Sequence, residues 1–216
     1  VVGRKPGDEV VIAPGFSCGR CEHCADGDDS LCRHYGIFGE TCDGTCAEQI
    51  VVPAHCCLDK PKALSFAEAA AIPLTFLTAW HMLVKRARVA AGDDVLIQAA
   101  GSGVGVAAVQ IAKRLRARVI ATAGRDAQVE RALALGADFG INYQRQDFLK
   151  EVRDTTGRRG VDVVIDHVGE PTIARSIAAL RKGGALVTCG ATGGFKLEVD
   201  LRLVFFKSLS ILGSTM

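Results

Sequence analysis

The chain has 216 residues, of which 49% are hydrophobic and 23% charged, and its formal net charge is only +2. This length and composition are those of an α/β protein with one large domain or two smaller ones. Basic residues are interleaved with acidic ones and no run of five like charges occurs, which excludes a nucleic-acid-binding stripe and a polybasic membrane patch. Small uncharged or acidic molecules are the expected partners.

No apolar stretch reaches the roughly 18 residues of a membrane span, and residues 1–9 lack a signal-peptide hydrophobic region. We therefore expect a cytoplasmic protein whose nine cysteines are thiols or metal ligands rather than disulfides. Because the chain begins with Val1 and ends at Met216 directly after an apolar run, we expect it to be a fragment of a longer protein.

The first 62 residues contain two short β-type runs, DEVVIAP (8–14) and AEQIVVP (47–53), on either side of a cysteine-rich segment. Apolar runs of this length bounded by Gly, Asp and Pro are typical of strands. We interpret residues 1–62 as part of an antiparallel β domain that carries a small metal lobe.

The cysteine segment reads CGRCEHCADGDDSLC (18–32), with the spacing C-x2-C-x2-C-x7-C. Thiolates at this spacing can converge on one ion, and four of them complete a tetrahedral shell with no open position for water or substrate. A structural zinc is the favoured interpretation. An iron–sulfur cluster is an alternative, although in bacterial ferredoxins the fourth cysteine follows after x3 and precedes proline; four free thiols are another. The predicted metal ligands are Cys18, Cys21, Cys24 and Cys32.

Other potential ligands receive simpler interpretations. His23 lies between two of the cysteines, but the four thiolates suffice, so we expect it to face solvent. The remaining five cysteines have no comparable spacing and are expected to be buried or incidental thiols. They are Cys42, Cys46, Cys56, Cys57 and Cys189.

Residues 63–92 are helical in composition. Ser65, followed by Glu68 three residues later, has the pattern of a capping box, and Pro73 predicts a break into a second helix. His81 lies in the apolar run WHML and is interpreted as a satisfied buried histidine rather than a ligand or a base.

From Asp93 onwards, strand-length apolar runs alternate with helical segments. Such runs, apolar on both faces, imply a parallel sheet covered by helices on both sides. Right-handed crossovers then give a doubly wound, six-stranded Rossmann sheet. The six strands are expected near 94–99, 118–123, 139–143, 162–167, 185–189 and 209–213.

The first of these strands runs into the turn AAGSGVG (99–105), and a helix follows at once. Glycines let the backbone approach a pyrophosphate, and the helix N-terminus supplies free N–H groups. The turn departs from G-x-G-x-x-G because Val106 occupies the last position, but it lies at the first strand-to-helix turn, where a dinucleotide binds. The alternative is close helix–strand packing without a ligand. The predicted contacts are Gly101, Ser102, Gly103, Val104 and Gly105.

The end of the second strand distinguishes the two nicotinamide dinucleotides. An acidic residue there would bind the adenosine ribose, whereas a cation would suit a 2′-phosphate. Gly124 leaves room and Arg125 offers a bidentate phosphate donor, so we predict NADP(H) in preference to NAD(H). Asp126 is the rival acid, but it opens the next helix and is interpreted as an N-cap.

Taken together, these motifs resemble the zinc-containing medium-chain dehydrogenase/reductase superfamily, which includes alcohol dehydrogenases and quinone oxidoreductases. The resemblance runs from PGDEVVIAPGFSCGRCEHCADGDDSLC through AAAIPLTFLTAWHML and AAGSGVGVAAVQIAK to GVDVVIDHVG and LSILGST. It implies three regions: part of a GroES-like catalytic domain (1–62), interdomain helices (63–92) and a Rossmann dinucleotide-binding domain (93–216). It also implies that the four-cysteine zinc is structural. Further cofactor contacts are implied, with packing as the alternative role, at Thr78, Tyr143, Val168 and Gly190.

One departure concerns a catalytic zinc. Relatives that have this metal use a Cys or Asp near the start of the interdomain helix, where this chain has Pro73, Leu74 and Thr75. The other ligands would lie before Val1. No catalytic residue is assigned.

The resemblance implies hydride transfer between NAD(P)(H) and an alcohol/carbonyl pair. An NADPH-dependent quinone or enone reductase without catalytic zinc is the first alternative, and a non-catalytic nucleotide-binding module is the second. The last strand, LSILGST, is expected at a sheet edge, and the resemblance implies a homo-dimer or homo-tetramer formed through it.

Overall fold

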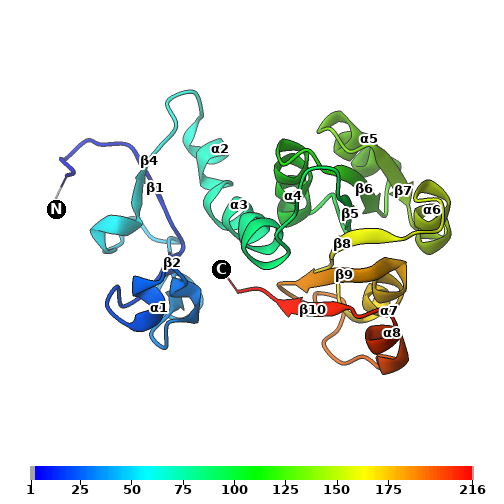
Figure 1. The fold of residues 1–216 in the computed structure, drawn as a ribbon. Coiled ribbons are helices and arrows are strands. Elements are labelled where there is room, and N and C mark those ends of the chain that lie inside the picture. The colour runs from blue at the N-terminus through cyan, green and yellow to red at the C-terminus, as the bar shows by residue number, and fades with distance from the viewer. Residues whose placement is uncertain (1–2, 216) are drawn as a thin grey trace. The chain divides into compact units, whose positions relative to one another are not determined.

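The computed structural model describes residues 3–215 of the chain. These residues divide into two compact units, one ending at Leu77 and one spanning Thr78–Thr215 (Figure 1). Each unit is considered by itself below.

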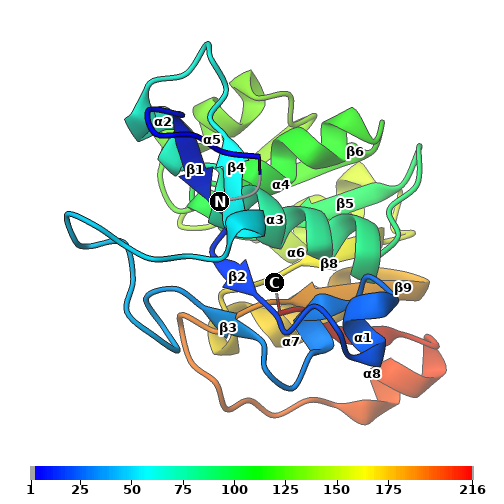
Figure 2. The same cartoon turned by 90° about the vertical axis from the view of Figure 1, so that its left-hand side faces the viewer.

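The first unit contains two short antiparallel strand pairs (Figure 2). In one pair β1 (Val10–Ile12) lies beside β4 (Cys57–Asp59), and in the other β2 (Gly15–Phe16) lies beside β3 (Gly36–Ile37). Between the strands are short helical turns with few buried side chains. These are α1 (Glu22–Ala25), η1 (Asp29–Leu31) and η2 (Ala54–Cys56).

The prediction of a strand over 47–53 is wrong. Within residues 3–215, no strand forms over this segment, and Val51 is 97% exposed. An alternating apolar pattern becomes a strand only where a neighbouring strand supplies hydrogen-bond partners, and a single-sequence pattern does not reveal that neighbour.

A capping box and a proline divide the helical segment that follows. Glu68 N donates to Ser65 Oγ (3.3 Å), and Ser65 N donates back to Glu68 Oε2 (2.9 Å), as predicted. Helix α2 (Phe66–Ala70) then ends, and α3 (Pro73–Trp80) begins at the proline and continues as a π-helical turn, η3 (His81–Arg86).

The helical run Phe66–Arg86 has 21 residues and a mean hydropathy of 1.3, long and apolar enough to cross a membrane by length and composition alone. This corrects the expectation that no stretch reaches that length. Thr75, Thr78 and His81 interrupt the apolar residues of this run, but the mean hydropathy stays high when they are included. Core helices of soluble proteins satisfy the same criterion, so it carries no membrane assignment.

The second unit is built on a six-stranded sheet in the order β10-β9-β8-β5-β6-β7, in which every neighbouring pair is parallel. This is the doubly wound arrangement expected from the sequence, with its reversal between β5 and β8. The strands are β5 (Asp94–Ile97), β6 (Arg118–Ala123), β7 (Phe139–Asn142), β8 (Val161–Ile165), β9 (Leu180–Thr188) and β10 (Ser210–Gly213). The connecting helices are α4 (Gly103–Arg114), α5 (Asp126–Ala134), α6 (Phe148–Thr155), α7 (Glu170–Ala179) and α8 (Leu201–Phe206).

Strand β9 begins five residues before the predicted segment. Leu180 is extended and buried, and it pairs with Val161 of β8 before the register shifts. Tertiary pairing therefore ends α7 at Ala179, although the helical pattern in the sequence continues.

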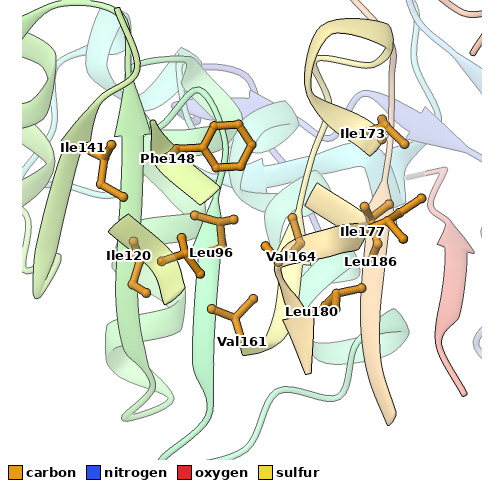
Figure 3. Packing of buried hydrophobic residues seen from close by; sticks show 12 residues of the cluster. Leu96, Ile120, Ile141, Phe148, Val161, Val164, Ile173, Ile177, Leu180 and Leu186 are labelled. Carbon is orange, nitrogen blue, oxygen red and sulfur yellow. The ribbon is translucent and has the colours of Figure 1, made fainter. Parts of the chain in front are cut away.

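The core of this unit lies between one face of the sheet and helices α6 and α7. Leu96, Ile120 and Val164 project from neighbouring strands toward Phe148 of α6 and Ile177 of α7 (Figure 3). All five side chains are no more than 2% exposed. Burying a Leu, Ile or Phe side chain stabilises a fold by about 1.5–3 kcal/mol, so this face holds the strands in register.

An ion-pair network closes the amino edge of the same sheet. Asp94 accepts hydrogen bonds from Arg118 Nη2 (2.7 Å) and Arg159 Nη2 (2.9 Å). Asp162 accepts from Arg159 Nη2 (2.6 Å), from Arg181, and from the backbone N–H of Asp94 (2.8 Å). Both carboxylates are buried, and three guanidinium groups neutralise them.

Candidate functional site

The four predicted metal ligands converge in the first unit. Their sulfur atoms all lie within 4.8 Å of one another, with Cys18 Sγ 3.9 Å and Cys21 Sγ 3.5 Å from Cys24 Sγ. A tetrahedral zinc with Zn–S bonds of about 2.3 Å places its sulfurs about 3.8 Å apart. The residues present therefore fit a tetrahedral four-thiolate zinc.

The surrounding backbone favours anionic sulfur. The N–H groups of Arg20 and Cys21 donate to Cys18 and lower the pKa of its thiol to about 6. The backbone N–H of Cys24 by itself lowers the pKa of Cys21, but the sulfur of Cys24 opposes it and the Cys21 pKa is raised to about 11. A bound cation would displace the proton that the Cys21 thiol donates to Cys24 Sγ.

The remaining cysteines lie outside this cluster. Cys42 and Cys46 are exposed, Cys56 is buried, and Cys57 and Cys189 are partly buried. His23 is not among the clustered ligands; its Nε2 lies 3.8 Å from a carboxylate oxygen of Glu22, and its side chain is 40% exposed.

The glycine turn joins β5 to α4 at the carboxyl edge of the sheet. Ser102 is the N-cap of α4, and its Oγ accepts a hydrogen bond from Gly105 N (3.0 Å). The N–H groups of Gly103 and Val104 have no acceptor within the helix, as at any helix start, and Gly103 is exposed. Free N–H groups on accessible backbone at a helix N-terminus fit a pyrophosphate.

The glycines of this turn serve different purposes. A Cβ on Gly105 would lie 2.4 Å from the carbonyl oxygen of Ala99, so glycine is required there for the helix to pack on the strand. A Cβ on Gly101 would lie 2.8 Å from the side chain of Gln128, which can move. The packing glycine that seemed to be missing at Val106 is therefore supplied one residue earlier.

Gly124, Arg125 and Tyr143 lie together at the end of β6. A Cβ on Gly124 would lie 2.7 Å from the Tyr143 hydroxyl oxygen, so the tyrosine packs directly against the glycine. Arg125 is exposed, and no acidic side chain among residues 3–215 pairs with it. An accessible guanidinium at this position fits a phosphate group.

The interpretation of Asp126 as an N-cap is wrong. Arg125 occupies the N-cap position with no side-chain hydrogen bond, and Asp126 is the first helical residue. Its carboxylate instead accepts a hydrogen bond from Asn142 Nδ2 and pairs with Arg145 Nη1 (2.7 Å). Asn142 ends the next strand, so the pairing depends on tertiary structure.

Val168 and Gly190 follow β8 and β9 at the same edge of the sheet. The carbonyl of Val168 accepts from Gly193 N (2.6 Å), and the hydroxyl of Thr188 donates to the carbonyl of Gly190 (2.9 Å). The first bond joins the two loops and the second lies within the loop after β9, and both predicted positions are near the carboxyl ends of the strands. Thr78 is buried on α3, and its role stays a prediction.

His81 is satisfied, as predicted, although it is only partly buried. Its Nδ1 lies 2.8 Å from the hydroxyl oxygen of Ser214, which follows β10. This hydrogen bond ties η3 to the end of the sheet.

Sequence reasoning missed His167, which follows β8. The residue is 8% exposed, and its Nε2 lies 2.9 Å from the Oγ of Ser102 in the glycine turn. Burial lowers the pKa of His167, with the neighbouring Asp166 acting in the opposite direction. A polar pair, Asp-His, directly after the buried strand VDVVI was the available signal.

Comparison with known proteins shows that both parts of the chain match known families. Residues 103–216 match the zinc-binding dehydrogenase family, and residues 1–62 match the alcohol dehydrogenase GroES-like domain. The chain belongs to the zinc-binding dehydrogenase family. The resemblance inferred from the sequence motifs is confirmed, and so is the fold class of a Rossmann sheet joined to part of a GroES-like domain.

Among relatives, the NAD-dependent alcohol dehydrogenase of Saccharolobus solfataricus is 35% identical over 99% of this chain and 62% of its own length. The quinone oxidoreductase of Homo sapiens is 30% identical over 98% of this chain and 62% of its own length. A crystal structure of a NAD-dependent alcohol dehydrogenase superposes with a TM-score of 0.95 and 55% identity, covering 99% of this chain and 62% of that one. The chain thus spans about three fifths of the length of these proteins.

Proposed function

We propose that this chain is part of an oxidoreductase that prefers NADP(H) and transfers a hydride between the nicotinamide and an alcohol/carbonyl pair. The observation that carries the proposal is the carboxyl edge of the sheet, where the glycine turn opens α4 and an unpaired cation, Arg125, follows the next strand. When bound, the dinucleotide would supply or accept the hydride. The chain's own residues bind and orient it.

Arg125 carries the preference for NADP(H). The acid that would compete for the ribose hydroxyls, Asp126, is already engaged by Asn142 and Arg145. Gly124 lets Tyr143 pack directly against the end of β6, since a Cβ there would lie 2.7 Å from the tyrosine hydroxyl oxygen. A 2′-phosphate placed here would find a free guanidinium and no free carboxylate.

The test is a pair of binding titrations, with NADPH and with NADH, on the wild-type chain and on Arg125→Ala. NADPH affinity should fall about 10- to 100-fold, the effect of a charge-assisted hydrogen bond, while NADH affinity should change less than about twofold. Arg131→Ala, an exposed arginine farther along α5, is the control for loss of charge alone. Equal losses for the two nucleotides would refute the preference, and binding of neither by the wild type would refute the site.

A quinone or enone reductase is the second candidate. The supporting observation is that Pro73, Leu74 and Thr75, where a catalytic zinc ligand would stand, include no metal-binding side chain. In this candidate, hydrogen-bond donors rather than a metal would polarise the acceptor. A panel of alcohols and quinones, assayed with the full-length protein, distinguishes the two, because turnover of quinones alone supports the second.

The proposal extends to a structural zinc held by Cys18, Cys21, Cys24 and Cys32, and to a cytoplasmic location. It also includes a homo-dimer or homo-tetramer. Strand β10 lies at the end of the sheet order and Ile211 on it is 47% exposed, which favours pairing with another copy. A monomeric mass from light scattering on the full-length protein would count against that assembly.

A further inference from the structure

The imidazole of His167 contains an unpaired buried atom. Its Nδ1 is the sole buried side-chain nitrogen or oxygen without a hydrogen-bond partner among the residues that the structure describes. The other ring nitrogen, Nε2, lies 2.9 Å from the hydroxyl oxygen of Ser102. The side chain therefore touches the glycine turn through one nitrogen only.

This arrangement selects one tautomer of the neutral ring. A neutral imidazole has one N–H and one lone pair, and a buried N–H without an acceptor is rarer in proteins than an under-used acceptor. The proton therefore belongs on Nε2, which donates to Ser102 Oγ, and Nδ1 keeps the lone pair. Burial lowers the pKa of His167, with Asp166 acting in the opposite direction, and thereby favours the neutral ring.

The turn that follows β8 holds the backbone of His167 in place. The buried carboxylate of Asp166 accepts from the backbone N–H of Val168 (3.0 Å) and from the hydroxyl groups of Thr172 (2.9 Å) and Ser176 (2.7 Å). The carbonyl of His167 itself accepts from Thr192 N (3.3 Å). These bonds leave the backbone of His167 little freedom to move.

The tautomer of His167 fixes the orientation of the Ser102 hydroxyl group. Its oxygen accepts from Gly105 N (3.0 Å) and from His167 Nε2, so both lone pairs are used. The hydroxyl hydrogen is left to donate elsewhere, beside the free N–H groups at the start of α4. A negatively charged oxygen is the acceptor that this set of donors fits.

We propose that His167 is a positioning residue for the pyrophosphate of the dinucleotide, because its Nε2–H directs the Ser102 hydroxyl hydrogen toward a phosphate oxygen. This inference rests on the dinucleotide site proposed above. It adds a residue from the turn after β8 to a phosphate site otherwise formed by the β5–α4 turn.

Binding titrations with NADPH test the role through two substitutions at His167. His167→Leu removes the donor and should weaken NADPH binding about tenfold. His167→Gln places an amide N–H near the position of Nε2 and should restore most of the affinity. If His167 only stabilises the fold, His167→Gln should restore NADPH affinity no more than it restores thermal stability. The unfolding temperature of each unliganded variant is therefore measured alongside the titrations.

A double-mutant cycle with Ser102→Ala examines the route of the effect. If His167 acts through the serine, His167→Leu should cost less than about twofold in NADPH affinity once Ser102 is alanine. Additive losses would overturn the inference.

The fragment 2′-AMP lacks the pyrophosphate and should bind wild type and His167→Leu equally. If His167→Leu weakens 2′-AMP binding as much as NADPH binding, the inference is also overturned.

The tautomer provides a readout independent of ligand binding. Long-range ¹H–¹⁵N spectra of the folded chain should show His167 protonated at Nε2, and protonation at Nδ1 would refute the proposal.

If the wild-type chain binds neither NADPH nor NADH, the proposed function fails and this inference fails with it. If the wild type binds and His167→Leu binds equally well, only the inference fails.

Discussion

Between Cys18 and Cys32 a single residue, Cys32, is buried, whereas every residue of β5 and β8 is buried. The cysteine lobe has almost no apolar core, and its four sulfurs converge where a metal would bind. The parallel sheet has no such cluster and buries apolar side chains from β5, β6, β8 and β9 against two helices. We therefore expect the two regions to respond to different perturbations. The cysteine lobe should depend on its metal ligands, and the parallel sheet should depend on side-chain packing.

The largest expected effect is the loss of zinc from the lobe. In Cys32→Ser the metal shell loses a ligand and the zinc content of the purified chain should fall toward zero. Structural zinc contributes about 10–16 kcal/mol in small zinc-finger peptides, so limited proteolysis should cut within residues 18–35 while the sheet stays intact. Zinc content is measured by mass spectrometry.

The matched control for this prediction is Cys42→Ser, an exposed cysteine outside the cluster. It should retain full zinc content and the wild-type proteolysis pattern. Retention of zinc by Cys32→Ser would show that the lobe does not depend on a four-thiolate shell, and the contrast between the two regions would disappear.

The converse prediction concerns the packed face of the sheet. Leu96→Ala leaves a cavity among Ile120, Val164 and the helices, and should cost about 3 kcal/mol of unfolding free energy in the second unit, measured by denaturant titration followed by circular dichroism. Zinc content should be unchanged. Leu201→Ala, at a position that is 67% exposed, should cost less than about 0.5 kcal/mol. Coupled loss of zinc in Leu96→Ala would mean that the two regions are not independent.

A smaller effect is expected at the amino edge of the sheet, where charge rather than packing joins the strands. Burial by itself raises the pKa of Asp162, but hydrogen bonds from Arg159 and Arg181 outweigh it and hold the pKa below its usual value. A carboxylate with a lowered folded-state pKa contributes stability above the unfolded-state pKa, and this stability is lost as the pH falls through the folded-state value. Acid below about pH 4 should therefore destabilise the second unit.

The variant Asp162→Asn isolates this contribution. At pH 7 it should be less stable by about 1–3 kcal/mol, the cost of weakening hydrogen bonds to a charged group, and its unfolding temperature should fall less steeply than that of the wild type between pH 5 and pH 3. Asp154→Asn, on the exposed side of α6, should follow the wild-type curve. If the unfolding temperatures of the wild type and Asp162→Asn fall equally steeply between pH 5 and pH 3, this carboxylate does not set the pH dependence of stability.

Sequence reasoning succeeded where a few adjacent residues carry the constraint. The spacing of the four cysteines predicted their convergence, the alternation of strands and helices predicted the sheet, and Ser65 with Glu68 predicted the capping box. It failed where the partner comes from elsewhere in the fold. The segment 47–53 has the pattern of a strand but no neighbour, and Asp126 pairs with the end of the next strand rather than with its own helix.

The amino-acid sequence by itself determined the family, the order of the strands' appearance and the two candidate ligand sites, because each of these is recorded in local spacing and periodicity. Tertiary structure alone decided which side chains from different strand ends meet at the carboxyl edge of the sheet. It placed His167, which follows β8, against Ser102 of the β5–α4 turn, 65 positions apart in the chain. The physical reason is that parallel strands bring their carboxyl ends together whatever their separation in sequence, and no local pattern encodes the hydrogen bonds that form there.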